Sequence, residues 1–229
     1  MAVPDNVFED FAARPYKAVR EIVRDGDVLL CSVHEPQSRL IRWATRSPWS
    51  HAALAFRLAE IDRVIVLECV EHLGVRAVPL SRFITRTSHG VTPYPGRILL
   101  ARHQGLAARS RQRPLKRMAE FAFDRLGDRF SQTEMMKIAL RIALGRFRVK
   151  TPPSLGPDDA FICSEYVARC FEAVGVKIPW DGYGFIAPAD IARDPRLEPI
   201  AQIATRSKIY ARLSPPRTRG RGPSATSSQ

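Results

Sequence analysis

No apolar run in the sequence reaches the roughly 18 residues that a membrane-spanning helix needs, and the first residues lack the apolar segment of a secretion signal. Only four cysteines occur among the 229 residues. None of them forms a CxxC pair, so the sequence indicates neither a disulfide scaffold nor a redox pair. A glycine-rich phosphate loop and an internal repeat are also missing. We therefore expect a cytoplasmic protein with reduced thiols.

A metal site has little support in the sequence. Cys31 and His34 are spaced as two ligands of a structural metal could be, but no second pair with ligand-like spacing follows them. We predict that the protein holds no metal and needs no cofactor.

Acidic residues are scarce relative to basic ones. The chain has 23 Asp and Glu against 36 Lys and Arg, which gives a net charge of +13. Such a surface favours anionic surroundings such as phospholipid headgroups, an acidic wall polymer or nucleic acid. No basic segment with interleaved aromatic residues is present, which argues against nucleic acid. We predict peripheral association with an anionic membrane or polymer.

The length and the 45% hydrophobic content predict one domain with one sizeable core. Residues 1–23 have helical periodicity interrupted by Pro15 and are expected to lead into a domain over 24–212. Within that domain, residues 106–150 are expected to form a helical insertion. Residues 213–229 consist mainly of Pro, Gly, Ser and Arg and are predicted to be a disordered basic tail.

Hydrophobic periodicity predicts an α+β fold in which successive strands form an antiparallel sheet that packs against helices, including the helix that carries Cys163. β-branched and apolar runs bounded by turn residues predict strands at 28–31, 50–56, 63–70, 75–80 and 97–101. Helical spacing predicts helices at 38–45, 112–126 and 131–145, and a last one that runs through Cys163 and ends at Gly175. Residues 151–157 are expected to form a loop.

Cys163 is the strongest candidate nucleophile. It follows Asp158 and Asp159, which are plausible N-cap residues, so the thiol is expected in the first helical turn. The positive end of a helix dipole favours the reactive thiolate there. The alternative is structural, because Cys163 also begins an apolar face on which a cysteine is just a small hydrophobe. Cys170, two turns inside the same helix, fits that structural role.

Two further residues are candidates for the same chemistry. His51 begins a strand, from which an imidazole can act as a general base; the alternative is a hydrogen-bonded strand histidine. Glu68 interrupts an apolar strand and is expected across from the early part of the His51 strand, where it could orient the imidazole. Alternatively, Glu68 marks the exposed end of its strand. The other histidines are expected to face solvent: His34, His72, His89 and His103.

Four short motifs occur in a distinctive order: residues 26–30 (GDVLL), 50–54 (SHAAL), 67–80 with Leu-Glu, Gly-Val and Pro-Leu, and 161–167 (FICSEYV). In this order they resemble the YiiX-like group of NlpC-type, papain-fold cysteine hydrolases. That group is circularly permuted, so that the histidine and acidic strands precede the cysteine helix. The resemblance covers roughly residues 24–190.

The resemblance implies a catalytic triad. Cys163 would be the nucleophile, His51 the general base and Glu68 the residue that orients His51, while Tyr166 is a candidate substrate contact. It also implies cleavage of an amide, as in cell-wall peptides, or of an acyl ester, as in the related lecithin retinol acyltransferase-like enzymes and thioesterases. The competing hypothesis is a non-catalytic basic module that binds an anionic membrane or nucleic acid.

Overall fold

The computed structural model describes residues 2–70, 73–85, 94–107, 112–128, 163–180 and 186–205. Several predictions fall outside these ranges: the helix at 131–145, the loop at 151–157, the cap residues Asp158 and Asp159, the two histidines His72 and His89, and the tail at 213–229.

Seven strands of the described chain form one sheet in the order β1-β7-β6-β2-β3-β4-β5. Neighbouring strands are antiparallel except β1 and β7, which are parallel. This confirms the predicted α+β class and its largely antiparallel sheet. The strands are β1 (Ala13–Arg14), β2 (Asp27–Val33), β3 (His51–Leu58), β4 (Arg63–Val70), β5 (Gly74–Pro79), β6 (Gly96–His103) and β7 (Leu197–Ile203).

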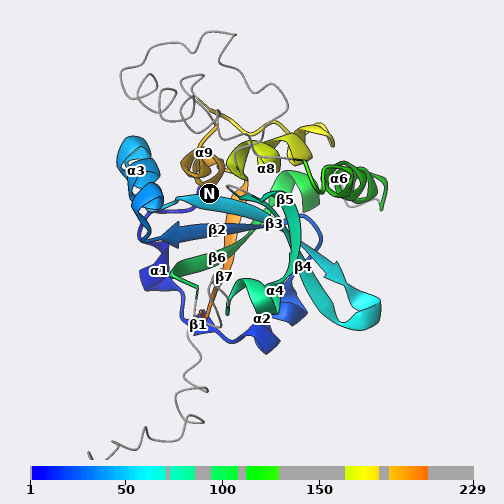
Figure 1. Cartoon of the computed structure of the whole chain (residues 1–229), viewed down its shortest axis with the longest axis horizontal. Helices are drawn as coiled ribbons and strands as arrows, with labels where there is room; N and C mark the ends of the chain where they lie inside the picture. The colour runs from blue at the N-terminus through cyan, green and yellow to red at the C-terminus, as the bar shows by residue number, and fades with distance from the viewer. Residues whose placement is uncertain are drawn as a thin grey trace, which may run out of the picture.

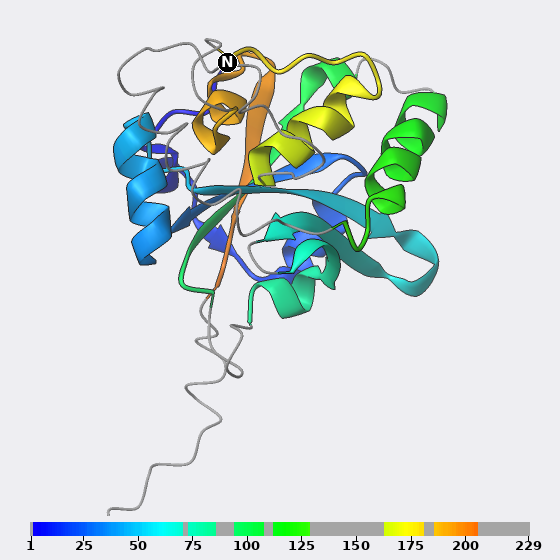
Figure 2. The same ribbon diagram turned by 45° about the horizontal axis from the view of Figure 1, so that its top comes forward.

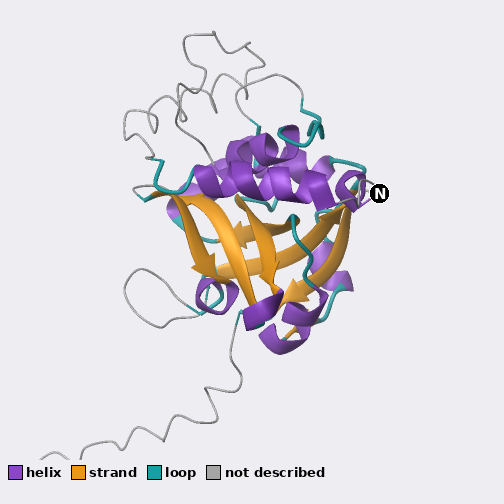
Figure 3. Ribbon diagram, turned by 90° about the vertical axis from the view of Figure 1, so that its right-hand side faces the viewer, coloured by secondary structure: helices purple, strands orange, loops and turns teal. Residues whose placement is uncertain are grey.

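Helices cover both faces of the sheet (Figure 1, Figure 3). Helices α6, α8 and α9 lie over one face, and α2 and α4 lie over the other. The helices are α1 (Val7–Asp10), α2 (Tyr16–Ile22), α3 (Pro36–Thr45), α4 (Leu80–Phe83), α5 (Gln104–Ala107), α6 (Gln112–Asp124), α8 (Cys163–Glu172) and α9 (Pro188–Arg193), with a short 3-10 helix at Ala59–Ile61.

The central strand β2 shows how the two apolar layers are built. Val28 and Leu30 pack toward α8 in one hydrophobic cluster, whereas Leu29 and Cys31 pack toward α2 and α4 in the other. Every residue of β2 is buried. A strand covered on both faces reads as a continuous apolar run instead of an alternating one, and this is the pattern at residues 28–31.

The segment at 1–23, expected to lead into the domain, contributes to its sheet and core. Ala13 and Arg14 form the edge strand β1 beside β7, and the side chains of Val7 and Val19 are fully buried. The helical pattern is interrupted there, as predicted: α1 ends at Asp10, and α2 begins directly after Pro15, whose lack of an N–H is tolerated at the start of a helix.

Helix α6, in the segment expected as an insertion, packs into the core beside α8 (Figure 2). Met118 and Ala122 are fully buried there. After α6, the Gly127 N–H donates to the Val75 carbonyl and the Val75 N–H donates to the Asp128 carbonyl, both at 3.0 Å, which ties the chain that follows the helix to β5. Within the described ranges, no helix is long and apolar enough to cross a membrane.

Candidate active site

Cys163 is the first described residue of α8, and its side chain is only 7% exposed. Burial alone would raise the pKa of this thiol. The charge and hydrogen bond of the His51 imidazole, together with the backbone N–H groups of Ala52 and Ser164, outweigh burial and lower the pKa below its ordinary value. The structure places Cys163 next to His51, while the residues before Cys163, on which the predicted helix start depends, lie outside the described ranges.

His51 opens β3 at a point that the preceding residue fixes. The Ser50 hydroxyl accepts a hydrogen bond from the Val33 backbone N–H (3.0 Å) and donates one to the Cys31 carbonyl (3.3 Å). Cys31 is also the cross-strand partner of His51 in β2. The loop that enters β3 is thus held against the end of β2, and the imidazole is placed beside Cys163.

Glu68 lies within reach of His51 because of the register between β3 and β4. Leu54 pairs with Leu67, so the continued antiparallel register makes Glu68 a diagonal neighbour of His51. The distance between His51 Nε2 and Glu68 Oε2 is 2.8 Å, and the Glu68 side chain is 2% exposed. Glu68 is therefore a buried partner of the imidazole and not the exposed end of its strand.

The three side chains determine each other's protonation. Burial would lower the pKa of His51, but the Cys163 thiolate and the Glu68 carboxylate together raise it to about 10. Burial would likewise raise the pKa of Glu68, but His51 and Arg76 lower it. The site therefore favours a thiolate–imidazolium pair with an ionised carboxylate behind it.

Arg76 is a member of this site that the sequence analysis missed. Its Nε and Nη2 atoms donate to Glu68 Oε1 at 2.9 and 2.7 Å. The two residues are cross-strand partners in β4 and β5. The sequence held a partial signal for this pair, since strands predicted at 63–70 and 75–80, joined by a short connection, bring position 76 close to Glu68.

Tyr166, expected to contact substrate, points into the core. Its side chain is fully buried, and its hydroxyl donates to the Ala122 carbonyl of α6 at 2.8 Å. The contact links α8 to α6. Tyr166 therefore presents no surface from which it could touch a substrate.

The other three cysteines differ from Cys163 in the direction in which their surroundings shift the thiol pKa. All four are free thiols. Burial raises the pKa of Cys31 and of Cys69 well above the ordinary value, and it raises the pKa of Cys170 to about 12. Cys170 is fully buried, as predicted for a structural cysteine.

Besides His51, the described ranges contain two histidines, and these differ in their exposure to solvent. His34 is exposed, as predicted. The prediction for His103 is wrong: it is 1% exposed and lies 3.2 Å from Asp194 Oδ2, whose carboxylate also accepts hydrogen bonds from Arg196. His103 packs against Phe171 in the core, so it stabilises the fold away from Cys163.

Comparisons with known proteins show a likeness in fold. No protein-family model and no curated protein matches the chain. The crystal structure of the metalloprotein yiiX of Escherichia coli O157:H7, assigned to DUF1105, resembles it with a TM-score of 0.55 and 17% sequence identity. The match covers 78% of this chain and 97% of that one. At this identity the likeness shows a shared YiiX-like fold.

That neighbour is described as a metalloprotein, so the candidate site of this chain has to be compared with a metal centre. Among the described residues, no three His, Cys, Asp or Glu side chains form a group that could hold an ion. The ligand atoms of the site are already engaged: His51 Nε2 with Glu68 Oε2, and Glu68 Oε1 with Arg76. The described residues do not fit a metal centre.

Proposed function

We propose that the protein is a cysteine hydrolase with a circularly permuted, papain-like fold of the NlpC type. The observation that carries the proposal is the convergence of Cys163, His51 and Glu68, with the thiol pKa lowered and the imidazole pKa raised. A buried structural cysteine would have a raised pKa, as Cys170 does. The chain order, with His51 and Glu68 before Cys163, is the order that the permuted group has.

In the first half of the reaction, the Cys163 thiolate attacks the carbonyl carbon of an amide or acyl ester. The tetrahedral oxyanion forms beside Cys163, and the backbone N–H of Cys163 is the donor that we propose for it. The protonated His51 then gives its proton to the leaving amine or alcohol, the carbon–nitrogen or carbon–oxygen bond breaks, and a thioester on Cys163 remains.

In the second half, a water molecule attacks the thioester carbonyl. His51, now neutral, takes a proton from the water, the carbon–sulfur bond breaks, and the acid is released. The thiolate and the imidazolium are restored together. Glu68 holds the Nε2 edge of the ring through this cycle, and Arg76 holds Glu68. Because Nε2 faces Glu68, Nδ1 is the ring nitrogen left for proton transfer at Cys163.

The proposal is tested by trapping the acyl-enzyme. The full chain is incubated with p-nitrophenyl acyl esters, quenched in acid and analysed by peptide mass spectrometry. We expect an acyl adduct on Cys163 that is lost in Cys163→Ala and greatly slowed in His51→Ala. Cys170→Ala, which removes a buried thiol from the same helix, should acylate like the wild type. Acylation that persists in Cys163→Ala, or none in the wild type, would rule out the proposed nucleophile.

A further inference from the structure

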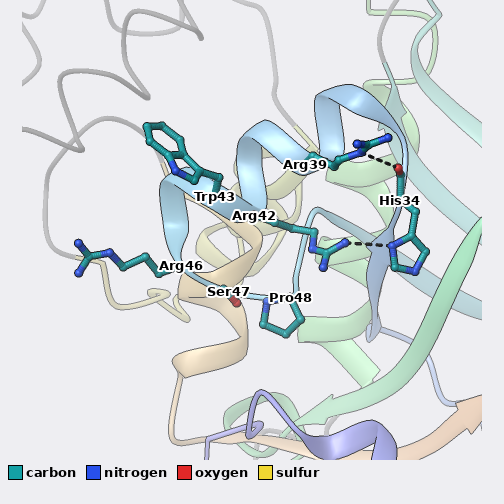
Figure 4. A pocket seen from close by; sticks show the side chains of 7 residues that line it. All are labelled: His34, Arg39, Arg42, Trp43, Arg46, Ser47 and Pro48. Carbon is teal, nitrogen blue, oxygen red and sulfur yellow. Dashed lines mark hydrogen bonds between the residues drawn. The ribbon is translucent and has the colours of Figure 1, made fainter.

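A pocket of about 690 Å³ lies beside α3, outside the candidate active site. Figure 4 shows its side chains, which include three arginines. Two of them lie on the last two turns of α3, and the third is the residue that caps its C-terminus. The residues that line it are His34, Arg39, Arg42, Trp43, Arg46, Ser47 and Pro48.

The positive charge of this pocket has no anionic partner in the described part of the chain. Arg39 Nε donates to the His34 carbonyl at 3.3 Å, and Arg42 Nη1 donates to the Val33 carbonyl at 3.2 Å. Arg42 Nη1 also lies 3.2 Å from His34 Nδ1, which must be the acceptor because a guanidinium has no lone pair to offer. The described partners of Arg39 and Arg42 are neutral. The Asp5 carboxylate reaches the lining of the pocket only through Ser47, whose hydroxyl donates to Asp5 Oδ1 at 3.4 Å, so the guanidinium groups keep most of their charge.

Arg46 occupies a backbone position that glycine would favour. It caps the C-terminus of α3 in the left-handed conformation, with φ of 49°. Glycine or asparagine is common at this position because a side chain with a Cβ is strained there. A long cation at this strained position adds a third guanidinium to the pocket.

Large apolar side chains flank these arginines on the outside of α3. Trp43 is 62% exposed and Leu40 is 45% exposed. Figure 4 shows the Trp43 indole projecting from α3 on the side away from His34 and Pro48. A helix whose outer surface combines Arg with Trp and Leu is typical of segments that lie in the headgroup region of a membrane.

We propose that α3 docks the protein on an anionic phospholipid surface. A lipid phosphate occupies the pocket of Arg39, Arg42 and Arg46, and Trp43 and Leu40 enter the boundary between headgroups and acyl chains. Guanidinium groups suit phosphate oxygens because they donate paired hydrogen bonds. The net charge of +13 gives the rest of the molecule the same attraction to such a surface.

The docking surface adjoins the candidate active site through a short stretch of chain. Ser47 and Pro48 line the pocket, and His51 begins β3 three residues later. Docking through α3 therefore brings the end of the sheet that holds His51 toward the lipid. The proposal does not depend on hydrolase activity, so it can be tested in a Cys163→Ala protein.

The test is co-flotation of full-length Cys163→Ala protein with vesicles of phosphatidylcholine, with and without phosphatidylglycerol. The pocket variant is Arg39→Gln with Arg46→Gly, in which glycine suits the backbone at position 46, so the thermal midpoint should not fall. The control variant, Arg63→Gln with Arg82→Gln, removes the same charge from exposed residues of β4 and α4, which lie away from α3 (Figure 1).

We expect binding to the anionic vesicles and not to phosphatidylcholine alone. The pocket variant should weaken binding by about thirtyfold, since each arginine near an anionic surface contributes about 1 kcal/mol. The control variant should change it by less than about twofold, because charges remote from the surface are screened. Equal losses in the two variants, or no binding to anionic vesicles, would overturn the proposal. Displacement of the protein from the vesicles by inorganic phosphate, at physiological ionic strength, would also overturn the proposal, because the pocket would then be a site for free phosphate.

Tryptophan fluorescence gives a second, independent readout. Trp43 should shift to shorter wavelength when anionic vesicles are added, and the shift should disappear in Trp43→Phe. Trp180→Phe is the matched control, because Trp180 is also exposed (42%) but lies outside α3. A shift that persists in Trp43→Phe and disappears in Trp180→Phe would contradict insertion of α3.

Discussion

Substitution of Arg76 tests whether Glu68 positions His51 for Cys163. Arg76 is expected to affect Cys163 only through these two residues. The Glu68 carboxylate is 2% exposed and receives two hydrogen bonds from Arg76 in addition to its contact with His51. Arg76→Gln removes the guanidinium and leaves a buried carboxylate with part of its charge uncompensated. Breaking a fully buried pair costs about 3–5 kcal/mol. Because the Arg76 side chain is 41% exposed and water screens it, we expect a smaller loss, about 1–2 kcal/mol in the free energy of unfolding.

Urea denaturation measures this loss directly, and the alkylation rate of Cys163 at neutral pH reports on the site. The rate should fall in Arg76→Gln, because a less firmly held Glu68 orients His51 less well. Arg76→Lys should restore part of the stability, since it keeps the charge but loses the paired hydrogen bonds. The control, Arg63→Gln, alters an exposed arginine of β4 and should stay within about 0.5 kcal/mol of the wild type. If Arg76→Gln matches Arg63→Gln in both measurements, the role assigned to Arg76 is refuted.

Tyr166→Phe should lower the free energy of unfolding by about 1 kcal/mol, because the hydrogen bond to the Ala122 carbonyl is lost. The alkylation rate of Cys163 should stay unchanged; a slower rate would show that Tyr166 belongs to the site. Asp194→Asn should cost about 2–3 kcal/mol in urea denaturation, because the buried carboxylate accepts hydrogen bonds from His103 and Arg196. It should also leave Cys163 reactivity unchanged. Burial lowers the pKa of His103, so the unfolded chain takes up a proton there before the folded chain does. Stability should therefore fall as pH drops below 6.5, and this part of the fall should be absent in His103→Gln; an identical fall in that variant would contradict the assignment.

The strands of the candidate site could be predicted from the sequence because their signals are local. The apolar run at 28–31 and the β-branched, apolar run at 63–70 each mark a strand that the structure contains as β2 and β4. The proximity of Glu68 to His51 follows from the hairpin that joins β3 and β4. Pairing over a short chain separation can be read from the sequence, because the turn fixes the register.

Strand β7 and helix α9 were not predicted, and β7 shows why. Its sequence contains Glu198 and Pro199, which weaken a strand pattern because proline has no N–H for the ladder. The structure accommodates Pro199 at an irregularity in the pairing with β6, between Leu100 and Ala101. Whether a proline fits a strand depends on the partner strand, which local sequence does not reveal.

The environment of a single residue also could not be predicted where it depends on a contact with a distant part of the chain. His103 was expected to face solvent because its neighbours in sequence are polar, yet its partner Asp194 lies 91 residues away. The pairing of Cys163 with His51 is likewise non-local, and at the level of sequence it rested on the family resemblance alone. Helical spacing predicted the helix at 38–45, but that pattern does not tell that Leu40 and Trp43 face outward.

The central claim is that His51 holds Cys163 as a thiolate, and the pH profile of iodoacetamide alkylation tests it most directly. The rate at each cysteine of the folded protein is measured by peptide mass spectrometry, in the wild type and in His51→Ala. The lowered pKa of Cys163 predicts fast alkylation well below pH 8.5, the ordinary thiol pKa, and the raised pKa of Cys31, Cys69 and Cys170 predicts slow reaction there. Cys163 should slow markedly in His51→Ala. If Cys163 reacts like an ordinary thiol, or reacts equally fast in both proteins, the thiolate–imidazolium pair does not exist.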